Sequence, residues 1–302
     1  MISIVLITYN RPEYLKFAIE GILNQTYEDF ELVVMDNGSD SSTAELLNSY
    51  KDKRIKLVRN DVNSRLFANQ SFQYTNREYL LITHDDDIMK PNFLSRMLEE
   101  IVKGDYDLLG CAIEEIDSSG KSLNRISGNK MQGLYELNNK TPISEYLNQN
   151  FLDCPTIIFK SSFILQNNIK WDFLAGPAAD ADLILTCLIL GGKVANLREH
   201  LYQYRVHENQ DSRINMITMH LDLFSHWMRR RDLTLSKEEI SWLHDIALKY
   251  IKNELRFSNA KYSNVKKSFN YLIASIGKVI NLESIKYFYK TVVWLVRYKI
   301  KY

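Results

Sequence analysis

The sequence predicts an α/β fold in which a mostly parallel, doubly wound sheet is covered by helices on both faces. In the first half of the chain, short β-branched apolar runs alternate with segments of helical periodicity, the pattern of right-handed βαβ units. The 302 residues are 45% hydrophobic and 25% charged, which excludes disordered, collagen-like and disulfide-scaffold chains. The three cysteines are too widely spaced for a disulfide framework or a structural zinc site.

The elements expected in the first half follow from this alternation. Ile2–Thr8 is a continuous apolar run, as in a strand that is buried on both faces. Pro12 marks the start of a helix that extends to Asn24, and residues 30–35 form the second expected strand, which ends in a turn at 36–40. The next elements expected are helices at 43–50, 66–74 and 91–103 and strands at 55–58, 79–82 and 107–113.

The second half changes from a mixed pattern to a helical one. Residues 117–139 are rich in Ser, Gly and Asn, which indicates a loop or a small hairpin. The elements expected after them are helices at 143–150 and 182–190 and strands at 156–160, 194–197 and 201–206. Beyond about residue 214 only helical patterns follow. We therefore expect a sheet domain at residues 1–214 and a helical C-terminal region at 215–302.

Polar clusters directly follow three of the expected strands, at residues 8–11, 36–37 and 84–87. Ligands of doubly wound sheets bind at the carboxyl ends of strands, so these clusters should line one crevice. Asp85, Asp86 and Asp87 would repel one another there by about 1–4 kcal/mol per close pair. Carboxylates and substrate phosphates are the usual ligands of Mg²⁺ or Mn²⁺, so the triplet indicates a metal-bound diphosphate. A solvated loop tip is the alternative.

Asp36 is a second candidate, because a carboxylate at the end of the second strand can accept a hydrogen bond from a base or a ribose hydroxyl. Its alternative role is a local turn contact. The chain contains neither GxGxxG nor GxxxxGK[ST], so neither a dinucleotide fold nor a P-loop is indicated.

Four motifs in this order resemble family 2 glycosyltransferases of the GT-A fold, in particular those of bacterial surface polysaccharides. They are IVLITYNRP at 4–12, ILNQTY at 22–27, FELVVMDNGS at 30–39 and DDDI at 85–88, followed by Pro91. Two features depart from the family pattern: residues 63–69 lack the glycines common in relatives, and His84 stands where many relatives have an aspartate.

The resemblance implies a GT-A fold and an inverting, metal-dependent hexosyltransferase. Such an enzyme moves a sugar from a nucleotide diphosphate, here expected to be a UDP-sugar, to a hydroxyl of a glycan or lipid-linked oligosaccharide. The residues implied to bind the nucleotide are Thr8, Tyr9, Arg11, Asp36, Arg65, Asp85 and Asp86. Those implied to bind Mn²⁺ or Mg²⁺ are Asp85, Asp86, Asp87 and His207, with Arg205 on the phosphates. The family's DXD motif can be aligned with Asp85 and Asp87, so the direct metal ligand stays open.

Residues 176–182 resemble the family's acceptor-side acidic motif, in which Ala179 replaces the first acid. Asp180 is therefore the candidate general base, and Asp182 is its competitor. In an inverting transfer, a carboxylate takes the proton of the acceptor hydroxyl while the oxygen attacks the anomeric carbon. The alternative role of Asp182 is to cap the following helix.

The net charge of +1 conceals an uneven distribution. Residues 246–302 hold 12 Lys and Arg against two acidic residues, so the rest of the chain is acidic. Within 284–302, Lys286, Lys290, Arg297 and Lys301 fall within about 60° of one another on a helical wheel, beside aromatic residues. Such a tail suits a helix lying on an anionic membrane, and a helix that packs on the body or forms a dimer is the alternative.

The expected location is the cytoplasm, with peripheral contact to the inner face of the membrane, because the first apolar run is too short for a signal peptide or a membrane span. The expected partners are a nucleotide-sugar donor and a glycan or lipid-linked acceptor, with no nucleic acid; oligomers are compatible with the sequence. The sequence leaves two alternative functions. A nucleotide-sugar-binding module without catalysis is compatible with Ala179. A sugar-1-phosphate nucleotidyltransferase is disfavoured because its Gly-rich N-terminal loop is missing.

Overall fold

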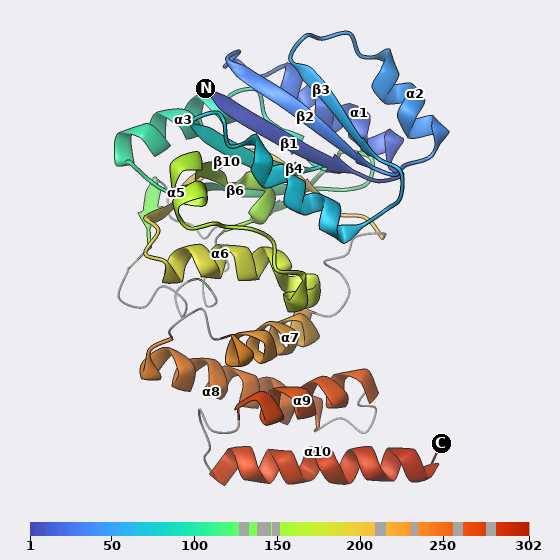
Figure 1. Cartoon of the computed structure of the whole chain (residues 1–302), viewed down its shortest axis with the longest axis vertical. Coiled ribbons are helices and arrows are strands. Elements are labelled where there is room, and N and C mark those ends of the chain that lie inside the picture. Colours follow the sequence, from blue (N-terminus) through green and yellow to red (C-terminus); the bar gives the residue numbers. More distant parts are fainter. Residues whose placement is uncertain are drawn as a thin grey trace. The chain divides into compact units, whose positions relative to one another are not determined.

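The computed structural model describes residues 1–126, 133–137, 146, 152–208, 216–230, 235–255, 262–275 and 282–301. The chain divides into two compact units (Figure 1). Unit 1 comprises residues 1–171 and 190–209, and unit 2 comprises residues 172–189 and 210–302. The expected boundary at 214 lies outside the described residues, as does the helix expected at 143–150 apart from residue 146. Residues 172–189, expected in the first domain, group with the helical C-terminal region.

Ten strands of the described residues form one mixed sheet in unit 1, in the order β3-β2-β1-β4-β9-β6-β10-β5, with β7 beside β6 and β8 beside β10. Their bounds are β1 (Ile2–Thr8), β2 (Phe30–Asn37), β3 (Ile55–Asn60), β4 (Tyr79–His84), β5 (Ile88–Met89), β6 (Leu108–Ile116), β7 (Ser122–Ile126), β8 (Leu134–Glu136), β9 (Ile158–Lys160) and β10 (Val194–Arg205). Strands β1 to β4 are parallel, as are β6 and β10, whereas β9 runs antiparallel between β4 and β6.

Helices cover both faces of this sheet. They are α1 (Pro12–Leu23), α2 (Ser41–Ser49), α3 (Phe93–Gly104), α5 (Ser161–Gln166) and the 3-10 helices η1 (Arg65–Tyr74) and η2 (Cys154–Thr156). In Figure 1, α1 lies behind the strands and η1 lies in front of them. Leu15 of α1 and Met97 of α3 share one buried core with Ile4 of β1, whereas η1 buries Phe67. The helix expected at 66–74 is thus present, but as a 3-10 helix.

One other expectation needs correction. The strands expected at 194–197 and 201–206 are one strand, β10, whose pairing with β6 shifts register between Leu197 and Tyr202. The small hairpin that was one of the two alternatives for 117–139 is present, because β7 pairs antiparallel with β6.

The register of the parallel strands brings the polar clusters to one edge of the sheet. Thr8 at the end of β1 aligns with Asp36 at the end of β2, and Ile7 aligns with His84 at the end of β4. Asp36 in turn aligns with Arg59 of β3. The segments that follow β1, β2 and β4 therefore emerge beside one another, as the positions of the clusters predicted.

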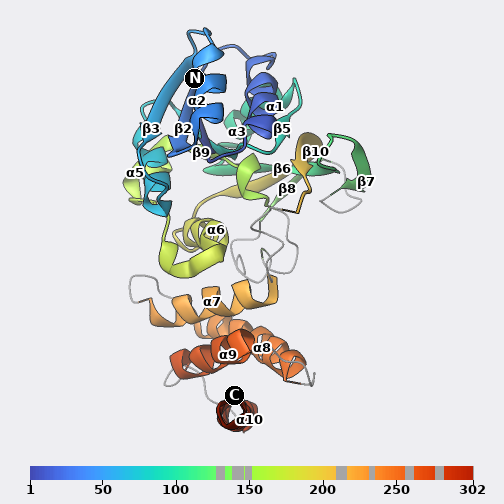
Figure 2. The ribbon, with the colours of Figure 1, turned by 90° about the vertical axis from the view of Figure 1, so that its right-hand side faces the viewer.

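Unit 2 is helical, as expected. Its elements are the 3-10 helix η3 (Phe173–Ala178) and the helices α6 (Ala179–Ile189), α7 (Met216–Arg229), α8 (Lys237–Glu254), α9 (Tyr262–Ser275) and α10 (Leu282–Lys301). In Figure 2, α10 is seen end-on beside α8 and α9. The buried His244 of α8 lies 2.6 Å from Ser284 of α10 and 3.0 Å from the hydroxyl of Tyr271 of α9. Among the described residues, no helix is both long and apolar enough to cross a bilayer.

Candidate active site

The acidic triplet lies in the turn between β4 and β5. Asp85, Asp86 and Asp87 are only 4%, 7% and 2% exposed, so none of them is a solvated loop tip. A buried carboxylate is costly unless donors or cations surround it. Two segments of unit 1 hold them: the residues after β1 and the end of β10 with the residues that follow it.

Asp85 is held by the segment that follows β1. Its Oδ2 accepts hydrogen bonds from the hydroxyl of Thr8 at 2.7 Å and from the backbone N–H of Tyr9 at 3.3 Å. Its Oδ1 lies 3.4 Å from Nη1 of Arg11. Burial, and then the negative charge of Asp86, raises the pKa of Asp85, and the Thr8 hydrogen bond opposes this shift.

Asp86 lies between two basic side chains. Nη1 of Arg11 donates to its Oδ2 at 3.0 Å, and Nε2 of His207 lies 3.0 Å from the same oxygen. His207 is buried, and its ring centroid lies 5.0 Å from that of Tyr14. Nε of Arg205 donates to the backbone carbonyl of Asp86 at 2.8 Å. The structure therefore brings together Arg11, Asp86, Arg205 and His207, four residues to which the resemblance gave roles in one site.

Asp87 is held by β10. The backbone N–H of Arg205 donates to its Oδ1 at 2.8 Å, and the hydroxyl of Tyr202 donates to its Oδ2 at 3.3 Å. Burial and the charge of Asp86 raise the pKa of Asp87. Burial, followed by the charge of Asp87, raises the pKa of Tyr202, so the phenol keeps its proton and acts as the donor.

The triplet has the donor set of a divalent cation site. His84, Asp86 and Asp87 each place one ligand atom within 4.8 Å of the others. Oxygen ligands from carboxylates suit Mg²⁺ and Mn²⁺, and imidazole is a further ligand for transition metals. The side chain of His84 is 51% exposed, so this set borders solvent. Burial, and then the charge of Asp86, raises the pKa of Asp85 and of Asp87, and a cation bound beside them would favour their charged forms.

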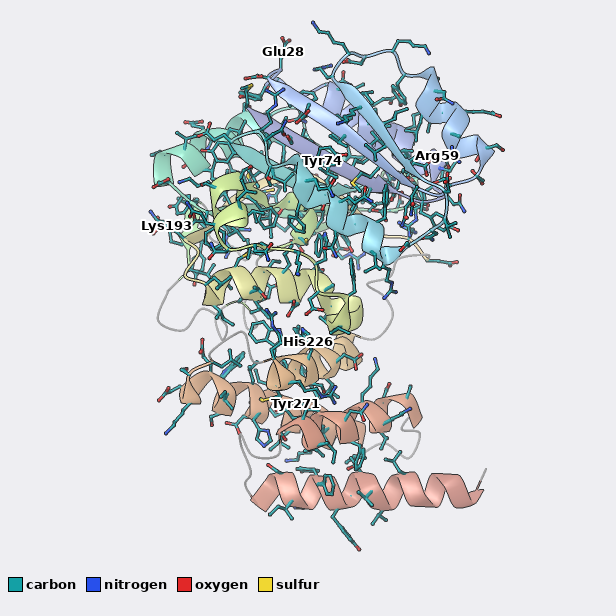
Figure 3. The ribbon with its side chains drawn as sticks, in the orientation of Figure 1. Glu28, Arg59, Tyr74, Lys193, His226 and Tyr271 are labelled. Atoms are coloured by element: carbon teal, nitrogen blue, oxygen red, sulfur yellow. The ribbon has the colours of Figure 1, made fainter. Side chains whose placement is uncertain are left out.

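Asp36 lies at the end of β2 and is also buried. Its Oδ1 accepts the backbone N–H of Ser39 at 2.9 Å, a local turn contact of the kind that the sequence offered as its alternative role. Its Oδ2 lies 3.6 Å from Nη1 of Arg59, which is labelled at the end of β3 in Figure 3. Nη2 of Arg59 also donates to the carbonyl of Ser39, so the carboxylate and this turn are fixed together.

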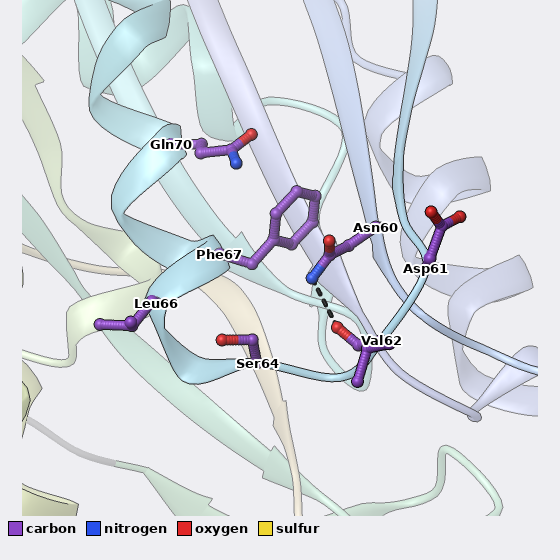
Figure 4. Close-up of a pocket in the computed structure, with 7 residues that line it drawn as sticks. All are labelled: Asn60, Asp61, Val62, Ser64, Leu66, Phe67 and Gln70. Atoms are coloured by element: carbon purple, nitrogen blue, oxygen red, sulfur yellow. Dashed lines mark hydrogen bonds between the residues drawn. The ribbon is translucent and has the colours of Figure 1, made fainter.

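A pocket of about 360 Å³ opens between the end of β3 and η1 (Figure 4). Its lining residues are Asn60, Asp61, Val62, Ser64, Leu66, Phe67 and Gln70. Asn37 at the end of β2 binds this segment, because it donates to Asn63 at 2.9 Å and accepts the N–H of Ser64 at 3.0 Å. The close approach of the backbone at Asn63 to the turn after β2 requires a glycine at position 38. Gly38 has a φ of +82°, and a Cβ at this position would lie 2.8 Å from the backbone nitrogen of Asn63.

The sequence profile described as Glycosyl transferase family 2 matches residues 3–167, which is more than half of the chain. The chain belongs to this family. The match contains β1, β2 and β4 with the clusters that follow them. The family and the glycosyltransferase class, both predicted from the motifs, are thereby confirmed. The predicted GT-A fold is confirmed by the solved structures described below.

Curated relatives of this glycosyltransferase carry the same class name. It is 29% identical over 243 residues to an uncharacterized glycosyltransferase of Methanocaldococcus jannaschii. The aligned region covers 76% of this chain and 81% of the relative. It is 28% identical over 215 residues to the O-antigen biosynthesis glycosyltransferase WbnJ of Escherichia coli. The aligned region covers 68% of this chain and 80% of WbnJ.

Solved structures of two other proteins share the fold of this glycosyltransferase. S. aureus TarS residues 1–349 superpose with a TM-score of 0.70 at 16% identity, covering all of this chain and 92% of that one. The mannosyltransferase PcManGT of Pyrobaculum calidifontis gives a TM-score of 0.60 at 12% identity, covering 98% of this chain and 86% of that one.

The two acceptor-side candidates of the glycosyltransferase lie in unit 2 and differ sharply from each other. Asp180 is exposed in the first turn of α6, where its Oδ1 accepts the N–H of Ala181 at 2.7 Å. Asp182 is buried, and its Oδ1 accepts hydrogen bonds from the indole of Trp227 at 2.6 Å and from Arg230 at 3.1 Å. Asp182 therefore does not cap the helix as its alternative role supposed, because α6 begins at Ala179.

Two of the predicted nucleotide-binding residues lie at the surface. Arg65 is exposed at the start of η1, and no ion pair joins it to the triplet within the described part of the chain. Tyr9 is also exposed, although its backbone N–H binds Asp85.

Two residues that hold the site had no individual role assigned from the sequence: Tyr202, and Asn10 within the cluster at 8–11. The sequence gives no sign of the role of Tyr202, because its place in a strand does not show that its hydroxyl reaches Asp87. Asn10 has a φ of 52°, donates its N–H to Ser39 and accepts the N–H of Asp40. An Asn two residues after the end of a strand is a usable signal for such a left-handed turn.

Proposed function

We propose that this glycosyltransferase is an inverting, metal-dependent enzyme of surface polysaccharide synthesis. It transfers a sugar from a nucleotide diphosphate donor, a UDP-sugar, to a hydroxyl of a glycan or lipid-linked oligosaccharide. The observation that carries the proposal is the buried acidic triplet at the carboxyl ends of β1 and β4. Three adjacent carboxylates in that position are hard to explain without a cation and a diphosphate.

The divalent cation is assigned to Asp86 and Asp87. Their carboxylate oxygens lie within 4.8 Å of each other and of a nitrogen of the exposed His84. Bound Mn²⁺ or Mg²⁺ supplies Lewis-acid stabilisation of the departing diphosphate. Asp85 instead fixes the segment after β1, and His207 orients Asp86. PcManGT, which shares the fold, has been crystallised with GDP-Man and Mn²⁺.

The nucleoside is assigned to the ends of β1, β2 and β3. Asp36 places one carboxylate oxygen near Arg59, and the pocket beside Asn60 offers amide, hydroxyl and aromatic groups of the kind that bind a base. Thr8 and Tyr9 border the same edge of the sheet through Asp85. The preference for UDP is supported by the TarS structures with UDP and with UDP-GlcNAc, which superpose with TM-scores of 0.67 and 0.59.

Asp180 is assigned as the general base. Its carboxylate is exposed, whereas the carboxylate of Asp182 is buried and accepts hydrogen bonds from Trp227 of α7 and from Arg230 just after it. Asp180 takes the proton of the acceptor hydroxyl as that oxygen forms a bond to the anomeric carbon. The bond from the anomeric carbon to the diphosphate oxygen breaks with its electron pair, so the nucleotide leaves and the configuration inverts. Arg11 and Arg205 are positively charged groups of the triplet site that favour the diphosphate.

The acceptor is assigned to a membrane-bound pool through α10. Ile285 and Tyr289 of this helix are 57% and 70% exposed. Each is followed in the sequence by an exposed lysine, Lys286 and Lys290. The opposite side of the helix is packed, since Tyr287 is buried. An exposed stripe of apolar, aromatic and lysine side chains suits the headgroup layer of an anionic bilayer. The name of WbnJ, an O-antigen biosynthesis enzyme, supports a surface-glycan acceptor.

The reaction is tested by measuring UDP-sugar hydrolysis and transfer with Mn²⁺ for wild type and the Asp180→Asn variant. The variant should keep its donor affinity while kcat falls by about 10²–10⁴-fold, since only proton transfer in the transition state is removed. Donor binding without any turnover in the wild type would instead identify a non-catalytic binding module. A fully active Asp180→Asn enzyme would remove Asp180 from the mechanism.

A further inference from the structure

A buried charged cluster in unit 2 joins α6 to α7 and to the residue before η3. Asp182 of α6 accepts hydrogen bonds from Trp227 of α7 and from Arg230 just after it. Arg230 also donates to the hydroxyl of Thr186, one turn further along α6, at 3.0 Å. His226, labelled on α7 in Figure 3, places Nε2 3.1 Å from Asp172 and 3.7 Å from Asp182.

The cluster has a metal-like spacing but a charge pattern that disfavours a metal. Asp172, Asp182 and His226 each offer one ligand atom within 4.8 Å of the others. Arg230 already brings a positive charge to within 3.1 Å of Asp182 Oδ1, and Trp227 donates to that same oxygen at 2.6 Å. A divalent cation there would face the guanidinium at short range and compete with both donors. An ion-paired network explains the contacts better than a metal site does.

The network holds a carboxylate that would otherwise be unfavourable. The side chain of Asp182 is only 2% exposed, and its burial raises the pKa, while Arg230 and Trp227 oppose that shift. A buried ion that is paired and hydrogen-bonded ties its two elements together, because separating them leaves an uncompensated charge. Asp182 therefore fixes the first turn of α6 against α7.

This attachment determines where the other acid of that turn points. Residues two apart on an α-helix differ by about 200° around its axis, so Asp180 and Asp182 lie on nearly opposite sides of α6. The anchored side carries Asp182, and the solvent side carries Asp180. Rotation of α6 about its axis would displace Asp180 and would also break the bonds of Asp182 to Trp227 and Arg230.

We propose that Asp182, Trp227 and Arg230 form a positioning network that orients Asp180 for proton transfer; His226 and Asp172 lie beside it. The inference rests on the proposed role of Asp180 as the base. It assigns a functional part to α7, which lies outside the residues 3–167 matched by the family profile. Asp182 is thus a positioning residue rather than a second base.

The test compares Trp227→Phe, which removes the indole N–H donor together with the five-membered part of the ring, with Trp242→Phe on α8, which loses the same atoms outside the network. Steady-state kinetics with a UDP-sugar and Mn²⁺ should show kcat about tenfold or more lower in Trp227→Phe, with the donor KM unchanged, since misplacing a catalytic group acts on the chemical step. Trp242→Phe should match wild type. Equal kcat in both variants, with their far-UV circular dichroism unchanged, would overturn the proposal.

Two further measurements separate this inference from the proposed function. In the Asp180→Asn background, Trp227→Phe should cause no additional loss, because residues that act through one another are not additive. An inactive Asp180→Asn enzyme combined with a normal Trp227→Phe enzyme would refute the network alone, whereas an active Asp180→Asn enzyme would refute the base assignment. A Zn²⁺- or Mn²⁺-induced thermal shift that is lost in His226→Gln would establish a metal site here and overturn the network.

Discussion

The hydrogen bond from Thr8 to Asp85 should be the strongest single attachment of the triplet to β1. Thr8 is 1% exposed, and its hydroxyl lies 2.7 Å from the carboxylate, whereas the contacts from Tyr9 and Arg11 are 3.3 and 3.4 Å long. A hydrogen bond to a charged group contributes about 1.5–3 kcal/mol. Thr8→Val keeps the branched shape and removes only the donor, so we expect the free energy of unfolding to fall by about 2 kcal/mol.

A double-mutant cycle in urea isolates this contribution. Wild type, Thr8→Val, Asp85→Asn and the double variant should give a coupling energy of about 1.5 kcal/mol or more. Thr43→Val is the matched control, because Thr43 is equally buried but its hydroxyl lies 3.3 Å from the exposed Asp40, where solvent screens the charge. A coupling energy below about 0.5 kcal/mol, or an equal loss in Thr43→Val, would refute the account of the triplet as a buried, donor-dependent charge cluster.

Three other predictions concern the cation, unit 2 and the lipid surface. Mn²⁺ should raise the melting temperature of wild type and of the exposed-site control Asp29→Asn, because a ligand that binds only the native state stabilises that state. It should not raise the melting temperature of Asp86→Asn, and a shift retained in that variant would contradict the metal assignment. Burial lowers the pKa of His244 from 6.5, so below about pH 6.5 the unfolded state binds a proton that the native state does not. The urea stability should therefore fall between pH 7.5 and 5.5, and His244→Gln should flatten that fall; parallel pH profiles would show that another group titrates. The full chain should sediment with phosphatidylglycerol vesicles more than with phosphatidylcholine vesicles, and a double change of Lys286 and Lys290 to Glu should abolish that difference; unchanged binding of the double variant would remove α10 as the lipid contact.

The fold was predictable wherever burial alone dictates the pattern. β1 has the predicted bounds Ile2–Thr8 because a strand buried on both faces must be continuously apolar. β10 was predicted as two strands because the charged and polar residues Arg198 to His200 interrupt its apolar pattern, yet irregular pairing with β6 carries the strand through. η1 shows the helical spacing expected of it, but periodicity does not reveal a 3-10 hydrogen-bonding pattern.

The site was predictable in its location and not in its contacts. The strand-end rule placed the triplet, Asp36 and the residues after β1 at one edge of the sheet, and the register agrees. The backbone N–H of Arg205 that holds Asp87 leaves no trace in the sequence, since every residue except proline has that group. Asp182 was expected to compete with Asp180 as the base or to cap a helix, but its partners Trp227 and Arg230 lie 45 and 48 positions further along and are found only when the chain folds.

The triplet depends on the second half of unit 1 as much as on the first. Asp85 is attached to the segment after β1, whereas Asp87 is attached to β10, and Asp86 lies between Arg11 from the first segment and His207 from the second. The family profile ends at residue 167, so it contains the three carboxylates but none of the groups that β10 and the residues after it contribute. A chain truncated there would keep the acidic motif while losing the donors of Asp87 and the imidazole beside Asp86. Because buried carboxylates without such partners are strongly unfavourable, the motif forms a folded site only when β10 completes the sheet beside β6.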